Sequence, residues 1–323
     1  MAAGKPSGWK RALLAVMAFG ALTTPAAAES WSIVTTTAQV GDIVRGVAGD
    51  EAAVESLMGA GVDPHLYRPT RSDVAALARA DLVFYNGLHL EGQMYDVLER
   101  LALDKPVVPV TERLEEARLL ADATGVSRFD PHVWMDVSVW MEGTATVAEV
   151  LAEADPPNAE TYRRNAEAYR AELARLDAYV RDVLASVPEG SRVLVTAHDA
   201  FNYMGDAYGL EVVGIQGIST ESEAGLQRIE EIVDLLVERG IAAVFVETSV
   251  SERNVRALID GAAAQGHEVR IGGTLYSDAM GEPGTYTGTY VGMIDHNATV
   301  IARALGGSAP PGGLNGRLDI EMN

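Results

Sequence analysis

Hydrophobic positions along the chain alternate between two patterns. Short runs rich in valine, isoleucine and aromatic residues, typical of buried strands, are followed by segments with apolar residues every three or four positions, typical of helices. The predicted strands cover residues 31–37, 53–58, 82–86, 106–110, 192–196, 210–215, 242–247 and 268–272. The predicted helices cover 40–48, 72–80, 91–103, 200–208, 223–239 and 252–265. This alternation predicts an α/β protein built from parallel βα units.

One helical pattern, over residues 155–190, is much longer than the others. Pro156 and Pro157 are tolerated only at its start, and Pro188 and Gly190 close it. About thirty residues at ~1.5 Å each form a rod of roughly 45 Å, longer than one small domain needs. One face is apolar, at Tyr162, Ala166, Tyr169, Leu173, Leu176, Val180 and Leu184. We expect this helix to link two lobes; an ordinary long helix lying on one domain is the alternative.

The same rhythm of strands and helices occurs on both sides of this helix. We therefore expect two similar (βα)4-type lobes with parallel sheets, an N-terminal lobe over residues 29–154 and a C-terminal lobe over residues 191–323, joined by the linking helix 155–190. The glycine- and proline-rich segment 306–313 predicts a flexible tail.

The first 28 residues are typical of a secretory signal peptide. Lys5, Lys10 and Arg11 precede an apolar run over residues 12–22, and small residues end at Ala28, where we expect cleavage. The apolar run is too short to span a bilayer, and no later segment approaches the ~18 to 20 apolar residues of a transmembrane helix. We expect a soluble, exported protein in a periplasm.

Composition narrows the choice of partners. A formal net charge of −21 makes nucleic acid and anionic membranes poor partners and favours cations, although acidity that serves only solubility explains the charge equally well. The absence of cysteine excludes disulfides, thiolate metal sites, cysteine nucleophiles and a lipid attached to an N-terminal cysteine. Any metal or catalytic chemistry must therefore use histidines, carboxylates and hydroxyls.

Four polar residues stand just beyond predicted strands, where open parallel sheets bind their ligands. His65 and His132 each follow an Asp-Pro pair, His198 ends the first strand of the second lobe, and Asp278 follows its last strand. Each histidine alone is more often structural, but three of the six histidines lie at such positions. Three imidazoles and one carboxylate suit zinc and its neighbours, whereas calcium and magnesium prefer more oxygens.

The chain resembles the zinc- and manganese-specific periplasmic solute-binding proteins of ABC importers. The resemblance rests on the two Asp-Pro-His motifs and on the segments 195–201 (VTAHDAF), 217–223 (GISTESE) and 276–278 (YSD). It implies two lobes joined by one backbone helix and a metal in the cleft between them, bound by His65, His132, His198 and Asp278. It also implies a monomer that delivers the ion to a membrane permease with its cytoplasmic ATPase.

Two clues to the metal oppose each other. Zinc-dedicated members of that family often carry a histidine-rich loop, whereas residues 112–128 contain acids and no histidine. Manganese-dedicated members commonly have glutamate where His198 stands, and a third imidazole favours zinc. The expected ligand is therefore one Zn²⁺ or Mn²⁺ per chain, with the choice open.

Other polar residues near the predicted strand ends have less defined roles. His89 follows a strand and is an alternative that could approach the metal or lie behind the ligands. Asp199 and Glu247 could accept the second N–H of the ligand imidazoles, which metal-bound histidines generally require. His267 and His296 are expected at the surface or in packing contacts.

We weigh three functions. A metal carrier without enzymatic activity or catalytic cofactor fits a single site and an exported chain. A periplasmic zinc metallohydrolase would need an open coordination position and a general base, and neither H-E-x-x-H nor G-x-S-x-G occurs. An adhesin or other interaction module would show no convergence of ligands.

Overall fold

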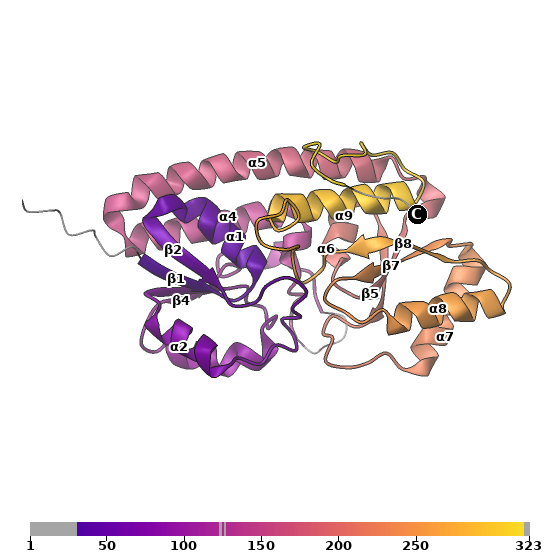
Figure 1. The fold of residues 1–323 in the computed structure, drawn as a ribbon, viewed down its shortest axis with the longest axis horizontal. Helices are drawn as coiled ribbons and strands as arrows, with labels where there is room; N and C mark the ends of the chain where they lie inside the picture. Colours follow the sequence, from indigo (N-terminus) through magenta and orange to yellow (C-terminus); the bar gives the residue numbers. More distant parts are fainter. Residues whose placement is uncertain (1–30, 123–124, 126, 320–323) are drawn as a thin grey trace, which may run out of the picture.

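The computed structural model describes residues 31–122, 125 and 127–319. The predicted signal peptide, with its cleavage site at Ala28, lies outside the described residues. Two α/β lobes stand side by side beneath one long helix, α5 (Ala159–Ala185), which runs along the top of both (Figure 1). No helix in the described part is long and apolar enough to cross a membrane.

The N-terminal lobe contains one four-stranded parallel sheet. Its strand order is β2 (Ala52–Ser56), β1 (Trp31–Thr35), β3 (Leu82–Tyr85) and β4 (Val107–Pro109). The helices that connect these strands are α1 (Ala38–Ala48), α2 (Arg71–Arg79) and α3 (Tyr95–Leu101). Parallel pairing places the carboxyl ends of all four strands at one edge of the sheet, which faces the second lobe.

The C-terminal lobe repeats this arrangement with two parallel strand pairs. The strands are β5 (Val193–His198), which pairs with β6 (Glu211–Gln216), and β7 (Ala243–Glu247), which pairs with β8 (Arg270–Leu275). Strands β5 and β7 are neighbours. Its helices are α6 (Asn202–Tyr208), α7 (Leu226–Arg239) and α8 (Arg253–Ala264). Every predicted strand is present, with ends within three residues of those predicted.

Helix α5 buries the face that its sequence predicts. Its buried residues include Tyr162, Ala166, Leu173, Leu176, Val180 and Leu184. The prolines at 156 and 157 form a single 3-10 turn before it, and the helix ends just before Pro188. Its 27 residues give a rod of about 40 Å, and Figure 1 shows it crossing both lobes rather than lying on one.

Two helices that we did not predict, α4 (Val137–Ala154) and α9 (Tyr290–Ala304), pack against α5. Both are buried on most sides, so neither shows the single apolar stripe of a surface helix. One continuous core results, because the same cluster contains Ile33 of the first sheet, Leu176 of α5 and Phe245 of the second sheet. This shared core opposes large rotations of one lobe against the other.

The end of the described chain differs from the flexible tail predicted over residues 306–313. The backbone N–H of Ser308 donates to Ser186 Oγ at 2.7 Å, and that of Leu314 donates to Asp295 Oδ1 at 2.9 Å. Leu314 and Leu318 also pack against the large core. The segment therefore lies along α9 and the end of α5, because its few apolar side chains and backbone donors find partners there.

Candidate metal centre

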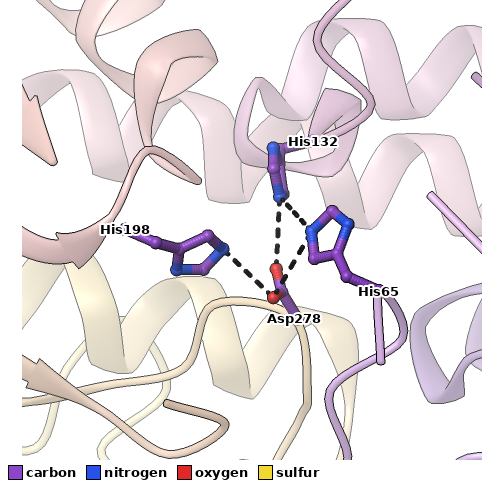
Figure 2. Close-up of side chains that lie close together, drawn as sticks. All are labelled: His65, His132, His198 and Asp278. Atoms are coloured by element: carbon purple, nitrogen blue, oxygen red, sulfur yellow. Dashed lines mark hydrogen bonds and ion pairs between the residues drawn. The ribbon is translucent and has the colours of Figure 1, made fainter. Parts of the chain in front are cut away.

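The structure brings the four predicted site residues together between the lobes (Figure 2). His65 lies in the loop after β2, and His132 lies in the loop before α4. His198 is the last residue of β5, and Asp278 follows β8 by three residues. All four side chains are buried. His65, His198 and Asp278 come from the carboxyl ends of parallel strands, and the loop that leads into α4 brings His132 to them.

The ligand atoms are spaced as a single metal ion requires. Their separations are 3.3 Å for His65 Nε2 to His132 Nε2, 3.4 Å for His132 Nε2 to Asp278 Oδ1, and 3.1 and 3.9 Å from Asp278 Oδ2 to His198 Nε2 and His65 Nε2. All lie within 4.8 Å of one another. In a tetrahedron with bonds of ~2.1 Å, neighbouring ligand atoms are about 3.4 Å apart.

Several of these buried atoms lack a hydrogen-bond partner. His198 Nε2 and both carboxylate oxygens of Asp278 have none among the described residues. His198 Nε2 lies 3.1 Å from Asp278 Oδ2, but the two atoms do not have the angles of a hydrogen bond. Leaving such groups buried and unpaired is unfavourable, and a cation between them would satisfy them together.

Carboxylates behind two of the histidines fix the orientation of their rings. Glu247 accepts the backbone N–H of His198 at 2.9 Å and lies 2.6 Å from its ring Nδ1. Asp130 stands in the same relation to His132, at 2.9 and 2.7 Å. A proton on each Nδ1 leaves the Nε2 lone pair free for a metal.

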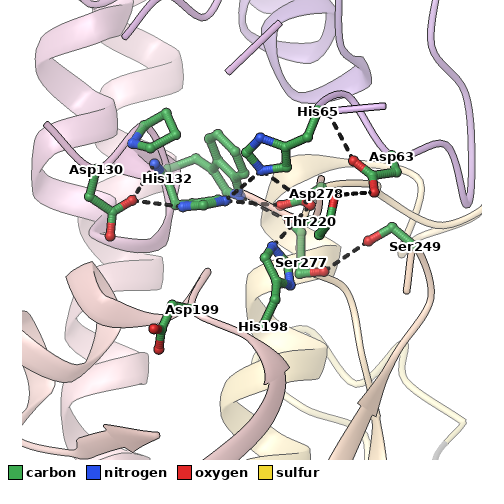
Figure 3. Close-up of polar contacts among 12 residues, drawn as sticks. Asp63, His65, Asp130, His132, His198, Asp199, Thr220, Ser249, Ser277 and Asp278 are labelled. Carbon is green, nitrogen blue, oxygen red and sulfur yellow. Dashed lines mark hydrogen bonds and ion pairs between the residues drawn. The ribbon is translucent and has the colours of Figure 1, made fainter. Parts of the chain in front are cut away.

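The predicted role in orienting an imidazole therefore holds for Glu247 and not for Asp199. The carboxylate of Asp199 instead accepts the backbone N–H of Gly214 at 2.9 Å, and Figure 3 shows Asp199 apart from the rings of His132 and His198. We did not predict Asp130, although the sequence carries a signal for it. An aspartate two residues before a histidine can accept that histidine's backbone N–H, and Asp63 does so for His65 at 2.9 Å.

The three histidines of the site differ in the direction in which their pKa is shifted. Burial lowers the pKa of His65 to about 3, so its ring is neutral. Burial also opposes protonation of His132, but Asp130 and Asp278 outweigh it and raise the pKa of His132 to about 9. Asp278 and Glu247 outweigh burial at His198 as well and raise its pKa well above the usual value. Protons on these two rings therefore offset the negative charges of the carboxylates beside them.

The pKa of Asp278 moves in the opposite direction. Burial would raise it, but the neighbouring rings of His198 and His132 hold it well below the ordinary range. The carboxylate is therefore ionised across the physiological range and contributes one negative charge to the centre.

The three other histidines lie outside this cluster. His89 is exposed, stacks on Tyr95 with ring centroids 4.6 Å apart, and lines a hollow of about 360 Å³ that also touches His65. His267 and His296 contact backbone carbonyls through Nε2 at 2.8 and 2.9 Å, consistent with packing roles. Asp96, Asp122 and Glu221 also line the hollow.

The donor set suits a first-row divalent metal. Three imidazole nitrogens and one carboxylate fill a tetrahedral zinc site, and binding through both oxygens of Asp278 would raise the coordination to five. Four protein ligands leave no position assigned to a reactive water in the tetrahedral arrangement. This donor set is therefore better suited to holding an ion than to activating water on it.

Comparisons with known proteins agree with this geometry. The chain is 46% identical over 277 residues to the manganese-binding lipoprotein MntA of Bacillus subtilis, covering 86% of this chain and 90% of the relative. It is 45% identical over 273 residues to the zinc-binding protein TroA of Treponema pallidum, covering 84% of this chain and 88% of the relative.

The fold matches a solved structure of the latter protein. The structure of the periplasmic zinc-binding protein TroA superimposes with a TM-score of 0.83 at 44% sequence identity, covering 85% of this chain and 99% of that one. The family model described as the periplasmic component A of the zinc-uptake complex matches residues 33–304. This chain belongs to that family of periplasmic metal-uptake proteins.

Proposed function

We propose that this protein binds one divalent transition-metal ion through His65, His132, His198 and Asp278 and delivers it to the membrane permease of an ABC importer. The observation that supports this most is the convergence of four buried ligand atoms, several without a hydrogen-bond partner, from both lobes. The net charge of −21 favours the approach of cations.

The relatives support transport rather than catalysis. One is named a manganese-binding lipoprotein and another a zinc-binding protein, and the matching family is a component of an uptake complex. The alternative of a zinc metallohydrolase has no support in these relatives. The chain is therefore a solute-binding protein of metal transport and not an enzyme.

The identity of the metal is a separate part of the proposal. The manganese-binding and zinc-binding relatives are about equally similar to this chain, at 46% and 45% identity. Ligand chemistry favours zinc in vitro, because nitrogen-rich sites bind zinc more tightly than manganese. We propose that zinc displaces manganese from the isolated protein, whichever ion the importer carries.

We further propose that the chain acts as an exported monomer with its signal peptide removed near Ala28. Residues 29–154 and 191–323 would form the lobes, and 155–190 the segment that joins them. The family description of a periplasmic component supports this location. The permease and its ATPase are the expected protein partners.

Metal titration tests the proposal directly. Wild-type protein stripped of metal should take up one equivalent of Zn²⁺, measured by elemental analysis after equilibrium dialysis. The double substitution His132→Ala with His198→Ala should abolish this uptake, because it removes two of four ligands. His267→Ala is the matched control, since its ring lies outside the cluster. Equal uptake by the double variant would exclude the assigned site.

A further inference from the structure

The two Asp-Pro-His motifs share one local contact and differ in a second. In both, the aspartate Oδ1 accepts the backbone N–H of the histidine at 2.9 Å. In the second motif this same oxygen also lies 2.7 Å from the histidine ring. Asp63 of the first motif makes no contact with the ring of His65; its other oxygen accepts the hydroxyl of Thr220 at 2.6 Å (Figure 3).

This contact with Thr220 crosses from one lobe to the other. Thr220 lies in the loop between β6 and α7 of the C-terminal lobe, whereas Asp63 follows β2 of the N-terminal lobe. The next residue of the loop makes a second crossing contact, because Gln93 Nε2 donates to Glu221 Oε1 at 3.1 Å. Thr220 is buried and the second contact is exposed, so the contact with Asp63 is the better shielded from water.

His65 depends on this arrangement more than the other ligands do. In the described part of the chain its ring Nδ1 makes no hydrogen bond, in contrast to those of His132 and His198. Its ring is therefore positioned by its backbone, and Asp63 holds that backbone. His65 is also the one ligand that lines the hollow at the mouth of the site. A change at Asp63 would reach the metal through His65.

We infer that Asp63 and Thr220 form a clasp between the lobes that positions His65 and sets the rate at which the bound metal leaves. The inference rests on the proposed function, since it concerns the release of the same ion. Opening the clasp would free the loop that carries His65 and detach this ligand first, while Asp130 and Glu247 still hold the other two imidazoles. Both residues are positioning residues, because neither belongs to the ligand cluster.

The test compares release rates from zinc-loaded protein mixed rapidly with excess chelator. Thr220→Val removes the hydroxyl while keeping the side-chain shape, and release should become roughly tenfold faster, as for other residues that orient ligands. Thr220→Ser keeps the hydroxyl and should restore a rate close to wild type. The association rate should change little, because the four ligands remain.

Two further variants separate the clasp from a general loosening of the fold. Asp63→Ala should also speed release, and adding Thr220→Val to it should have no further effect, because the two side chains act through one contact. Thr248→Val is the matched control, since its buried hydroxyl has no partner in the described part of the chain. It should release zinc at the wild-type rate.

The outcomes are distinguishable from failure of the proposed function. Wild-type release after Thr220→Val, or effects of Thr220→Val and Asp63→Ala that multiply, would overturn the clasp while leaving metal binding intact. A wild-type protein that takes up no zinc would overturn the proposed function itself. Thermal unfolding of each metal-free variant, unchanged from wild type, would assign the faster release to the site.

Discussion

The two Asp-Pro-His motifs are identical as tripeptides, yet the structure uses them differently. The motif at His132 is enclosed: Asp130 contacts its ring, Asn202 Nδ2 donates to the other oxygen of Asp130 at 3.1 Å, and the loop is buried in the core shared by both lobes. The motif at His65 lies at the rim of the site, and Leu66 beside it is 50% exposed.

The aromatic residues that follow each motif extend the contrast. Trp134, two residues after His132, donates its indole N–H to the carbonyl of Ser277 at 3.0 Å and so fixes the residue before Asp278. Tyr67, two residues after His65, donates to Asp73 at 2.7 Å within its own lobe. His132 is therefore held from both lobes, whereas, within the described part of the chain, the hydrogen bonds that link His65 to the opposite lobe run through Asp63. We expect His132 to anchor the metal and His65 to govern its exchange.

Replacing the histidine of each motif in turn should give the largest difference in zinc affinity between the two motifs. His132→Ala should weaken zinc binding by roughly two to three orders of magnitude. This is about one quarter of the binding free energy of a structural zinc site with four ligands. His65→Ala should weaken it less, because a loosely oriented ligand contributes less once its ordering is counted. Competition with a chelator of known affinity measures both. Equal losses would remove the distinction between anchor and exchanging ligand.

Replacing the aspartate of each motif by asparagine should give the next largest difference in zinc affinity between the motifs. Asp130→Asn removes the carboxylate beside the ring of His132 and should weaken zinc binding about 10- to 100-fold. Asp63→Asn should have little effect on affinity, because an amide can still accept the N–H of His65 and can still hydrogen-bond the hydroxyl of Thr220, so the clasp is kept. The same competition assay applies. A larger effect of Asp63→Asn would reverse our ranking of the motifs.

The pH dependence of zinc affinity should distinguish the two motifs. The pKa of His132 is raised to about 9 from 6.5, so this ring carries a proton near neutral pH that zinc must displace, whereas the lowered pKa of His65, about 3, leaves nothing to displace. Zinc affinity should therefore rise about tenfold per pH unit, for each proton released, as pH increases toward 9. Calorimetry in buffers of different ionisation enthalpy counts the protons.

The same two histidines should act at opposite ends of the stability profile of the metal-free protein. A raised pKa means that the contribution of His132 is complete below 6.5 and is lost as pH rises through about 9. A lowered pKa means that the contribution of the neutral ring of His65 to the free energy of unfolding is complete above 6.5. This contribution is lost as pH falls toward about 3. Denaturant unfolding at several pH values should show both losses. An affinity and a stability that stay flat between pH 6 and 9 would contradict the assignment to His132.

The sequence was sufficient for the fold and for the four clustered residues, for a physical reason. Parallel βα units leave a strong alternating pattern, and their topology gathers strand-end residues such as His198 and Asp278 at one edge. Helices α4 and α9 were missed because burial on most sides removes the amphipathic pattern by which a helix is recognised.

The partners of the site residues were harder to predict. Glu247 could be named because it ends a strand next to the site, but the contact of Asp63 with Thr220 joins residues 157 positions apart. Nothing in the repeated tripeptide shows that one aspartate faces a ring and the other faces the opposite lobe. Such contacts depend on how the lobes pack, which local patterns do not encode.

The smallest expected difference concerns the two aromatic residues. Trp134→Phe keeps a buried ring but removes the N–H that the carbonyl of Ser277 accepts, so the loop carrying Asp278 loses one support. A neutral hydrogen bond contributes about 1 kcal/mol, so zinc affinity should fall roughly fivefold. Tyr67→Phe, which removes a hydroxyl bonded within one lobe, is the matched control and should leave affinity unchanged. If Tyr67→Phe lowered affinity as much as Trp134→Phe, contacts within a lobe would position the ligands as effectively as contacts between lobes, and the greater rigidity that we assign to the motif at His132 would have to come from Asp130 alone.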